Sequence, residues 1–227
     1  MSRVGAIILA AGCGSRMNMD TTKQQLVLGG MSVLKRTVGT FARCDKISEI
    51  IVVARAEELQ FAKDEVFEFD KVSAVVIGGQ TRLESAKCGF SALGGNVEYV
   101  AIHDAARCLV TDGDICAVIS DAEKYGAATA ACRVTDTVKK VDRNGKIICT
   151  VNRDELVTVQ TPQIFKTDLY KKAIKYVSVS DLSVTDDNML MEKIGVDVHC
   201  TFTGTKNIKI TVRDDLAYAK FLLNGDN

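Results

Sequence analysis

The chain has little proline, histidine or tryptophan, and no excess of charge of either sign. Its 227 residues include one proline, two histidines and no tryptophan, and two histidines argue against a zinc site. Lys plus Arg and Asp plus Glu both number 29, so the net charge is zero, which argues against a nucleic-acid-binding surface. No apolar run reaches the roughly 18 residues that a membrane span requires. The first residues also lack the pattern of a signal peptide.

The chain contains eight cysteines, but none forms a C-x-x-C pair. Several of them, such as Cys88 and Cys132, lie in apolar runs, where a thiol behaves as a small hydrophobic side chain. We therefore expect reduced thiols and a cytoplasmic protein, and not a disulfide framework. The length suits one α/β domain or two small ones.

Strand-like and helix-like patterns alternate through the first half of the chain. Apolar β-branched runs cover residues 4–9, 49–54, 72–77 and 98–103, and helical patterns cover residues 31–44, 57–67, 81–93 and 112–125. This alternation predicts βαβ units and a mostly parallel sheet. Ligands bind beyond the carboxyl ends of such strands, so the loops after Leu9, Ile77 and His103 are expected at one shared edge.

The alternation stops near residue 127. A strand over 127–134 is followed by Asn144-Gly145 between two β-type runs, which is a strong hairpin signal. We expect an arm over about 136–158 that packs on a second subunit, although a hairpin folded on its own sheet is the alternative. Further patterns predict strands over 156–160, 196–202 and 207–210, and helices over 167–177, over 186–194 and from about 214. Without an evident linker, residues 1–227 are expected to form a single domain with this arm.

The first loop combines glycines with positive charge. Gly12 and Gly14 follow a buried strand, and Arg16 and Lys23 come soon after, which favours binding of a polyphosphate. The loop is neither a P-loop nor a dinucleotide fingerprint, since Met17 stands where the latter needs a small residue. An ordinary strand-to-helix turn remains the alternative.

Two further loops carry candidate residues. Gly78 and Gly79 would let the backbone approach a flat base, and Arg82 and Ser85 on the following helical turn would bind a base or ribose. Thr81 and Glu84 are explained by a capping box. Asp104 follows a central strand, where a carboxylate is a typical Mg²⁺ ligand, or else caps the next element. His103 is expected to be packed and hydrogen-bonded, not a catalytic base.

Fewer signals come from the second half. Pro162 predicts a rigid extended segment. Thr185 is expected to cap a helix, with Asp186 and Asp187 as acids that favour the helix dipole. Lys209 lies in a short predicted strand, where a solvated role is the simpler interpretation.

Taken together, these strings resemble a known family. LAAGCGSRM, GGQTRLES, HDAAR, TVNR, QTPQIF, Thr185-Asp186-Asp187 and NIKIT occur in an order similar to that of the 2-C-methyl-D-erythritol 4-phosphate cytidylyltransferases, over nearly the whole chain. The resemblance implies a Rossmann-like nucleotidyltransferase fold and a homodimer joined by the hairpin arm. It also implies that CTP and methylerythritol phosphate give CDP-methylerythritol and pyrophosphate, with Mg²⁺, in non-mevalonate isoprenoid synthesis.

The resemblance assigns roles to individual residues. Those matched to nucleotide binding are Ala10, Ala11, Gly12, Gly79, Gln80, Ser85 and Ala105, and we add Gly14 and Arg82 from the same two loops. Arg16 and Lys23 match transition-state stabilisers, and Asp104 matches the carboxylate beside the metal. Lys209 and Arg153 match residues that position the acceptor phosphate, with Arg153 supplied by the partner's arm. Weaker substrate contacts are matched by Arg107, Thr137, Thr161 and Thr185.

Three positions depart from the usual pattern of the family. Cys108 and Thr22 stand where proline is common, and Gln80 replaces a frequent aspartate in the base-reading loop. A ribitol-5-phosphate cytidylyltransferase is the nearest alternative activity, and a non-catalytic nucleotide-binding protein on the same fold is a second. An NAD-dependent oxidoreductase is excluded by Met17. Because the acceptor phosphate is already an anion, the expected chemistry needs no general base.

Overall fold

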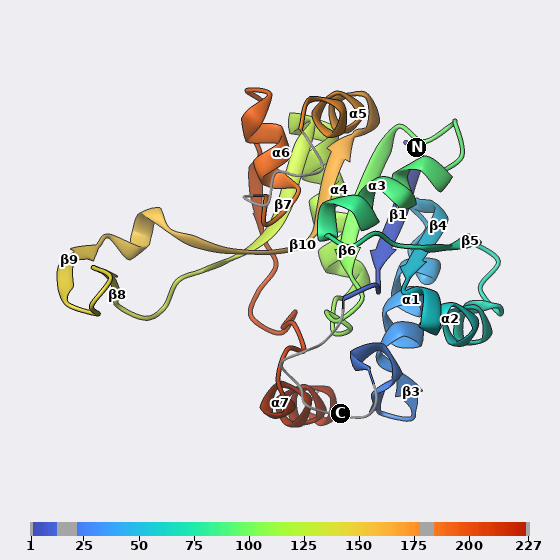
Figure 1. The fold of residues 1–227 in the computed structure, drawn as a ribbon, viewed down its shortest axis with the longest axis horizontal. Helices are drawn as coiled ribbons and strands as arrows, with labels where there is room; N and C mark the ends of the chain where they lie inside the picture. The colour runs from blue at the N-terminus through green and yellow to red at the C-terminus, as the bar shows by residue number, and fades with distance from the viewer. Residues whose placement is uncertain (1, 13–21, 178–183, 226–227) are drawn as a thin grey trace.

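A seven-stranded mixed sheet is the centre of the described structure, a computed structural model that describes residues 2–12, 22–177 and 184–225 (Figure 1). The strand order is β11-β7-β10-β6-β1-β4-β5. The strands are β1 (Val4–Leu9), β4 (Ile47–Ala54), β5 (Val72–Ile77), β6 (Tyr99–Asp104), β7 (Ala127–Arg133), β10 (Val157–Lys166) and β11 (His199–Phe202). Strands β5, β4, β1 and β6 run parallel, whereas β10 is antiparallel to both β6 and β7. The carboxyl ends of the four parallel strands therefore share one edge, as the sequence predicts.

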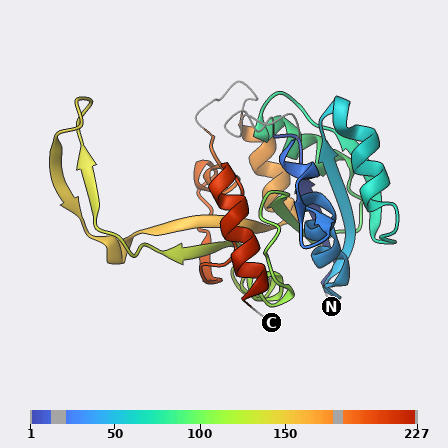
Figure 2. The same cartoon turned by 90° about the horizontal axis from the view of Figure 1, so that it is seen from below.

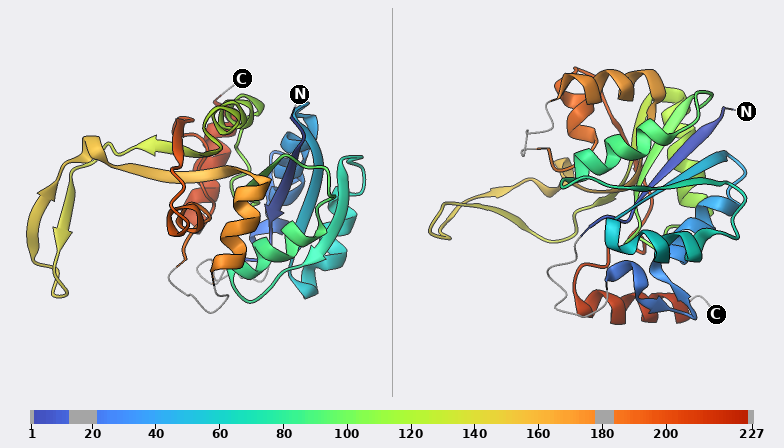
Figure 3. Two further views of the ribbon diagram at one scale, coloured as in Figure 1. Left: turned by 90° about the horizontal axis from the view of Figure 1, so that it is seen from above. Right: turned by 45° about the vertical axis from the view of Figure 1, so that its right-hand side comes forward.

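Helices cover both faces of this sheet, as Figure 3 shows. The alternation within β1 explains why, since Ala6 and Ile8 contribute to one apolar core and Ile7 to the other. On the first face lie α1 (Val33–Arg43), α2 (Leu59–Val66) and α4 (Asp112–Tyr125). On the second face lie α3 (Arg82–Ala92), α5 (Thr167–Tyr176) and α6 (Asn188–Lys193). Thr81 and Glu84 form the predicted capping box at the start of α3.

A smaller apolar cluster lies beside the first face. It joins Leu28, Ile210 and Ala219, and so attaches the end of the chain to the region after the first loop. The elements there are η2 (Lys23–Gln25), β2 (Val27–Leu28), β3 (Met31–Ser32) and α7 (Arg213–Asn224), and η3 (Ala56–Glu58) precedes α2. No helix in the described ranges is long and apolar enough to cross a membrane.

A hairpin arm projects from the body, as Figures 1 and 2 both show. Strands β8 (Val138–Val141) and β9 (Ile147–Val151) form a separate two-stranded sheet, followed by η4 (Arg153–Glu155). The turn contains Gly145 at a φ of 82°, a left-handed conformation that glycine adopts without strain. The alternative of a hairpin folded on the main sheet is therefore wrong, because β8 and β9 pair only with each other in the described structure.

Two predicted elements differ from the structure. The strand expected over 156–160 continues to Lys166, because β10 passes through Pro162 with a register shift between Val159 and Gln163. An irregularity of this kind tolerates the missing N–H of proline inside a sheet. The strand expected over 207–210 is absent from the described structure, where this segment is irregular and Ile210 N donates to Ala106 O over 2.9 Å.

Candidate active site

Two cavities lie at opposite edges of the sheet. One, of about 370 Å³, is lined by residues that precede β1, β5 and β6, among them Arg3 and Lys71. The other, of about 260 Å³, includes Asp104 at the carboxyl end of β6. Ligands of parallel sheets bind at carboxyl ends. The second cavity, named the Asp104 pocket below, is therefore the candidate site although it is the smaller of the two.

The first and third loops are attached to the sheet by their backbones. Ala10 N donates to Val53 O over 2.7 Å, and Ala105 N donates to Leu9 O over 3.0 Å. Both alanines are buried. Gly12 is exposed, and a Cβ added there would meet no atom within 4 Å, so space is open beside its backbone. Gly14 and Arg16 lie outside the described residues.

Lys23 lies on η2, close behind the first loop. The neighbouring Gln24 side chain donates to Ala10 O over 2.6 Å and so connects η2 to this loop. Lys23 itself is 9% exposed. Burial opposes the charge of Asp215, but hydrogen bonds from Thr211 and Val212 and the charge of Lys23 lower its pKa. The charge of Lys23 thus acts on an acid at the start of α7, while its backbone segment is connected to the first loop.

The glycines of the second loop serve packing. A Cβ on Gly78 would lie 2.8 Å from Ala11 Cβ, and one on Gly79 would lie 2.2 Å from Glu84 Cβ. Glycine is thus required here by contacts within the protein, whereas the sequence interpretation assigned these positions to the approach of a base. Ser85 is buried and its hydroxyl donates to Gly79 O, so this hydrogen bond helps to hold the second loop in place. Gln80 is exposed, and its N–H donates to Glu84.

Three cations surround the Asp104 carboxylate. Lys209 Nζ lies 2.7 Å from Oδ2, Arg107 Nε lies 3.8 Å from Oδ2, and Arg82 Nε lies 3.7 Å from Oδ1. All four residues line the Asp104 pocket. Burial would raise the pKa of Asp104, but Arg82, Lys209 and Arg107 hold it at about 2. The pocket therefore combines one permanently ionised carboxylate with three positive charges and would attract an anion.

His103 fixes the backbone of Asp104 through Thr161. The Thr161 hydroxyl accepts from Asp104 N over 3.0 Å, so its own proton points to His103 Nδ1, 3.1 Å away. His103 Nε2 then donates to Arg107 O over 3.3 Å. Burial lowers the pKa of His103 to about 3. The histidine is thus neutral and structural, as the sequence predicts, and Thr161 is a support of the pocket as well as part of its wall.

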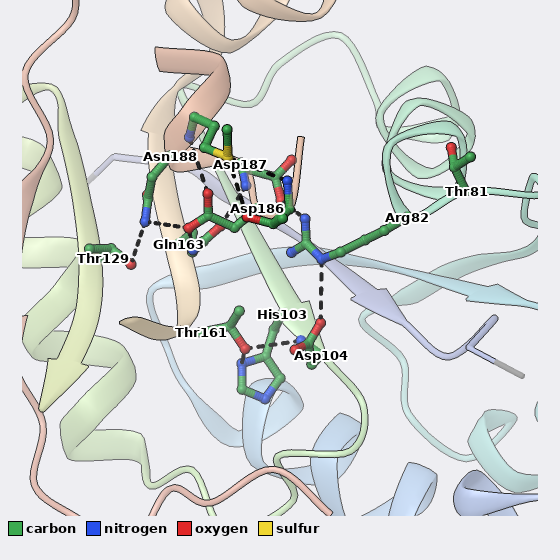
Figure 4. A network of polar contacts seen from close by, with 12 residues as sticks. Thr81, Arg82, His103, Asp104, Thr129, Thr161, Gln163, Asp186, Asp187 and Asn188 are labelled. Atoms are coloured by element: carbon green, nitrogen blue, oxygen red, sulfur yellow. Dashed lines mark hydrogen bonds and ion pairs between the residues drawn. The ribbon is translucent and has the colours of Figure 1, made fainter. Parts of the chain in front are cut away.

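A second group of polar side chains contacts Arg82 on the side of Asp187, away from Asp104 (Figure 4). Arg82 Nη1 lies 2.5 Å from Asp187 Oδ2, and Tyr170 OH donates to Asp187 Oδ1 over 2.7 Å. The Gln163 side chain accepts from Asp187 N and donates to Asp186. Asp187 is 1% exposed. The sequence interpretation assigned this acid to the helix dipole and did not single out Gln163.

The remaining predicted residues fall into two places. Thr185 lines the Asp104 pocket but does not cap α6, since its hydroxyl contacts Met189 Sδ, 3.3 Å away. Arg153 and Thr137 lie on the arm and are exposed, and neither lines the Asp104 pocket of its own chain. Arg153 Nη1 donates to Thr135 O over 2.6 Å.

Comparison with known proteins identifies the family. Residues 4–225 match the family model "IspD: 2-C-methyl-D-erythritol 4-phosphate cytidylyltransferase". The chain belongs to this family. A curated member from Alkaliphilus oremlandii is 40% identical, over 98% of this chain and 96% of its own. One from Pelotomaculum thermopropionicum is 37% identical, over 98% and 95% of the two chains.

Solved structures agree on the fold. The 4-diphosphocytidyl-2C-methyl-D-erythritol synthase of Anaerococcus prevotii superposes with a TM-score of 0.87 at 33% identity, over 98% of this chain and 96% of that one. The cytidylyltransferase of Francisella tularensis gives 0.81 at 30% identity, over 97% and 99%. This cytidylyltransferase family member thus has the Rossmann-like nucleotidyltransferase fold and is a nucleotidyltransferase enzyme.

Among the described residues, two arrangements of side chains could hold a metal ion. Asp104 is a single carboxylate at a strand end, which suits a hard cation that is otherwise held by phosphate oxygens and water. Elsewhere, Cys44, Asp112 and Cys116 place their ligand atoms within 4.8 Å of one another, with 3.7 Å between the two sulfur atoms. These three residues join the end of α1 to the start of α4 and do not line the Asp104 pocket.

Proposed function

We propose that this chain transfers a cytidylyl group from CTP to 2-C-methyl-D-erythritol 4-phosphate, giving CDP-methylerythritol and pyrophosphate for non-mevalonate isoprenoid synthesis. Membership of the family supports the reaction. The observation that carries the assignment to a site is the Asp104 pocket, in which Arg82, Arg107 and Lys209 face one carboxylate. A phosphorylated acceptor suits this excess of positive charge.

The reaction is an in-line displacement at phosphorus. An oxygen of the acceptor phosphate forms a bond to the α-phosphorus of CTP, while the bond from that phosphorus to the bridging oxygen breaks and pyrophosphate leaves. The attacking phosphate is already anionic, so no general base is needed, and the buried neutral His103 is not placed to act as one. Catalysis therefore consists of positioning and stabilisation of negative charge.

Separate sets of residues are proposed to bind the acceptor and the nucleotide. We assign Lys209 and Arg107 to the acceptor side, together with Thr161 and Thr185 in the wall of the pocket. Arg82, which the sequence interpretation assigned to the nucleotide, is proposed to act on the acceptor side as well, because its Nε lies 3.7 Å from Asp104 in this pocket. The nucleotide side comprises the first and second loops, with the residues Ala10, Ala11, Gly12, Gly14, Gly79, Gln80, Ser85 and Ala105. Arg16 and Lys23 are proposed to stabilise charge on the α-phosphoryl and the leaving pyrophosphate.

Mg²⁺ is the proposed cofactor. Asp104 fits this ion because its pKa of about 2 keeps it ionised, and because Mg²⁺ often takes one protein carboxylate plus substrate phosphates. When bound, the ion would offset repulsion between phosphate oxygens. Arg82, Arg107 and Lys209 would then contribute the protein's own share of the compensation.

The arm supports a homodimer. The side chains of Val141, Ile147 and Ile148 are each more than half exposed, which suits a surface buried against a second subunit. We propose that each arm brings Arg153 and Thr137 to the partner's acceptor site. The proposed partners are otherwise CTP and a sugar-alcohol phosphate, with neither nucleic acid nor membrane, and the free thiols of the described cysteines suit a cytoplasmic location.

One assay tests the reaction. Purified protein is incubated with CTP and Mg²⁺ and with either 2-C-methyl-D-erythritol 4-phosphate or ribitol 5-phosphate, and pyrophosphate release is measured. We expect release with the methylerythritol acceptor in large excess over ribitol phosphate. The reverse preference would identify the ribitol activity, and no release with either acceptor would contradict the proposed reaction.

A further inference from the structure

Two adjacent aspartates at the start of α6 have different environments. Asp186 accepts from Met189 N through Oδ1 over 3.1 Å and so satisfies a free N–H of the helix. Asp187 occupies the N-cap position, yet its side chain makes no capping hydrogen bond. It is also 1% exposed. Burial of an ionised carboxylate is costly, so helix capping does not explain why an acid stands at this position.

The Asp187 carboxylate is instead directed at Arg82. Both oxygens are engaged, with Tyr170 OH 2.7 Å from Oδ1 and Arg82 Nη1 2.5 Å from Oδ2, while the Asp187 backbone N–H donates to Gln163. Figure 4 shows Arg82 extending from α3 between Asp187 and Asp104. Burial opposes the charge of Arg82, but Asp187 first and then Asp104 raise its pKa. Of the two carboxylates that favour the charged guanidinium, Asp187 thus has the larger effect.

Arg82 differs in this respect from the other two cations of the Asp104 pocket. In the described ion pairs, Lys209 and Arg107 contact Asp104 alone, whereas Arg82 also contacts a second carboxylate outside the pocket lining. Its 3.7 Å approach to Asp104 is too long for a hydrogen bond. The guanidinium is therefore anchored through Nη1 on one side, and its Nε side faces the pocket.

We infer that Asp187 is a positioning residue that acts through Arg82. It fixes the guanidinium at an angle from which Arg82 donates to a phosphate oxygen of the substrate in the Asp104 pocket. A guanidinium held in advance loses less conformational freedom when the anion arrives, and small errors of placement are costly in such a site. The inference rests on the proposed function in that the substrate of this pocket carries a phosphate.

The test compares Asp187→Asn with Asp114→Asn. The first change keeps the shape and a partner for Tyr170 but removes the charge that holds Arg82. We expect turnover to fall on the order of tenfold to a hundredfold, since misplacement of a positioning group has effects of this size. Asp114 is likewise a helix-start aspartate, in the capping box of α4, and does not line the pocket. Its variant controls for lost stability and should retain wild-type turnover.

A double variant separates positioning from a merely structural role. If Asp187 acts through Arg82, then Asp187→Asn in an Arg82→Lys background should add little to the loss caused by Arg82→Lys alone. Additive losses would overturn the inference, and so would unchanged kinetics in a folded Asp187→Asn protein. Melting curves of all variants identify any that fail to fold. If Asp187→Asn is one of them, the milder Tyr170→Phe variant replaces it in the same double-mutant cycle with Arg82→Lys.

Binding of inorganic phosphate, measured by calorimetry, distinguishes failure of this inference from failure of the proposed function. Asp187→Asn should weaken binding severalfold, and Asp114→Asn should leave it unchanged. If the wild-type protein binds phosphate but releases no pyrophosphate, the proposed function is wrong. The comparison of phosphate affinity between wild type and Asp187→Asn then still tests the inference. Equal phosphate affinity in wild type and Asp187→Asn contradicts the inference, whatever the activity.

Discussion

The Asp104 pocket and the hairpin arm hold their arginines in different ways. Arg107 is 13% exposed in its side chain and contacts Asp104 and the backbone oxygen of Asn207. Arg153 is exposed on the arm, where it donates a hydrogen bond to the backbone of Thr135. The pocket thus fixes its cations through partners within one chain, and the arm presents a cation outward.

This difference indicates whether each region reaches its functional geometry within one chain or only on assembly with another surface. A cation that is ion-paired with a neighbouring carboxylate is oriented before a ligand binds, which favours catalysis by a preorganised site. An exposed arginine on a projecting hairpin gains a defined position only when the hairpin packs on another surface. We therefore expect the pocket to be sensitive to single changes in one chain, and the arm to depend on assembly.

The largest effect is expected for Lys209→Ala. Lys209 makes the shortest ion pair with Asp104, 2.7 Å, yet its side chain is 40% exposed, so it can also reach a bound anion. Its removal should lower turnover on the order of a hundredfold to a thousandfold, the usual cost of losing one preorganised donor. Steady-state pyrophosphate release measures this loss, and circular dichroism should show an intact fold. Turnover within threefold of wild type would contradict the assigned role.

A smaller loss is expected for Arg153→Ala, and it tests assembly directly. Because Arg153 would contact the acceptor and not the nucleotide, its loss should raise the acceptor KM about tenfold or more and leave the KM for CTP unchanged. Coexpression of Arg153→Ala with Lys209→Ala gives mixed dimers in which one of two sites contains both native residues. Purified mixtures should then recover up to about a quarter of wild-type activity if the arm crosses to a symmetric partner.

Failure to recover activity would place Arg153 in its own chain's site, and full activity of Arg153→Ala by itself would place it in neither site. Sedimentation of the wild type provides the control, since a monomer would exclude the crossing arm before any kinetics are measured.

The sequence predicted the elements of the sheet better than the contacts between them. Local periodicity indicates β1 and β5 at their observed bounds and α4 from Asp112 to Tyr125. It cannot show that Arg82 and Asp187, 105 residues apart, form a partly buried pair, because neither local segment contains that information. Asp187 next to a helix start was interpreted from local rules alone, and tertiary burial overrode them.

Irregular backbone was the second source of error. The extended segment predicted at Pro162 is confirmed, but the strand was expected to end at residue 160, whereas neighbours on both sides allow β10 to continue to Lys166 as a central strand. Lys209 was placed on a strand, but its segment is held by isolated contacts such as that from Ile210 N to Ala106 O. The loop glycines and the hairpin were visible in the sequence, whereas the individual roles of Arg16, Lys23 and Arg153 came from the family resemblance and stay predictions.

The last prediction concerns folding stability instead of turnover and tests, through His103, how the Asp104 pocket is held. Burial lowers the pKa of His103 to about 3 in the folded chain, against an ordinary value near 6.5. Between these values the unfolded chain binds a proton that the folded chain does not. His103 thus contributes stability that is fully present above pH 6.5 and is lost as the pH falls towards 3. Its contribution to the slope of unfolding free energy against pH is about 1.4 kcal/mol per pH unit.

Urea unfolding at pH 6.5, 5.5 and 4.5 should show this decline, in a window above the range where Asp104 titrates. His103→Asn retains an acceptor for Thr161 and should flatten the slope, and an equally steep slope in that variant would show that the proton is taken up elsewhere.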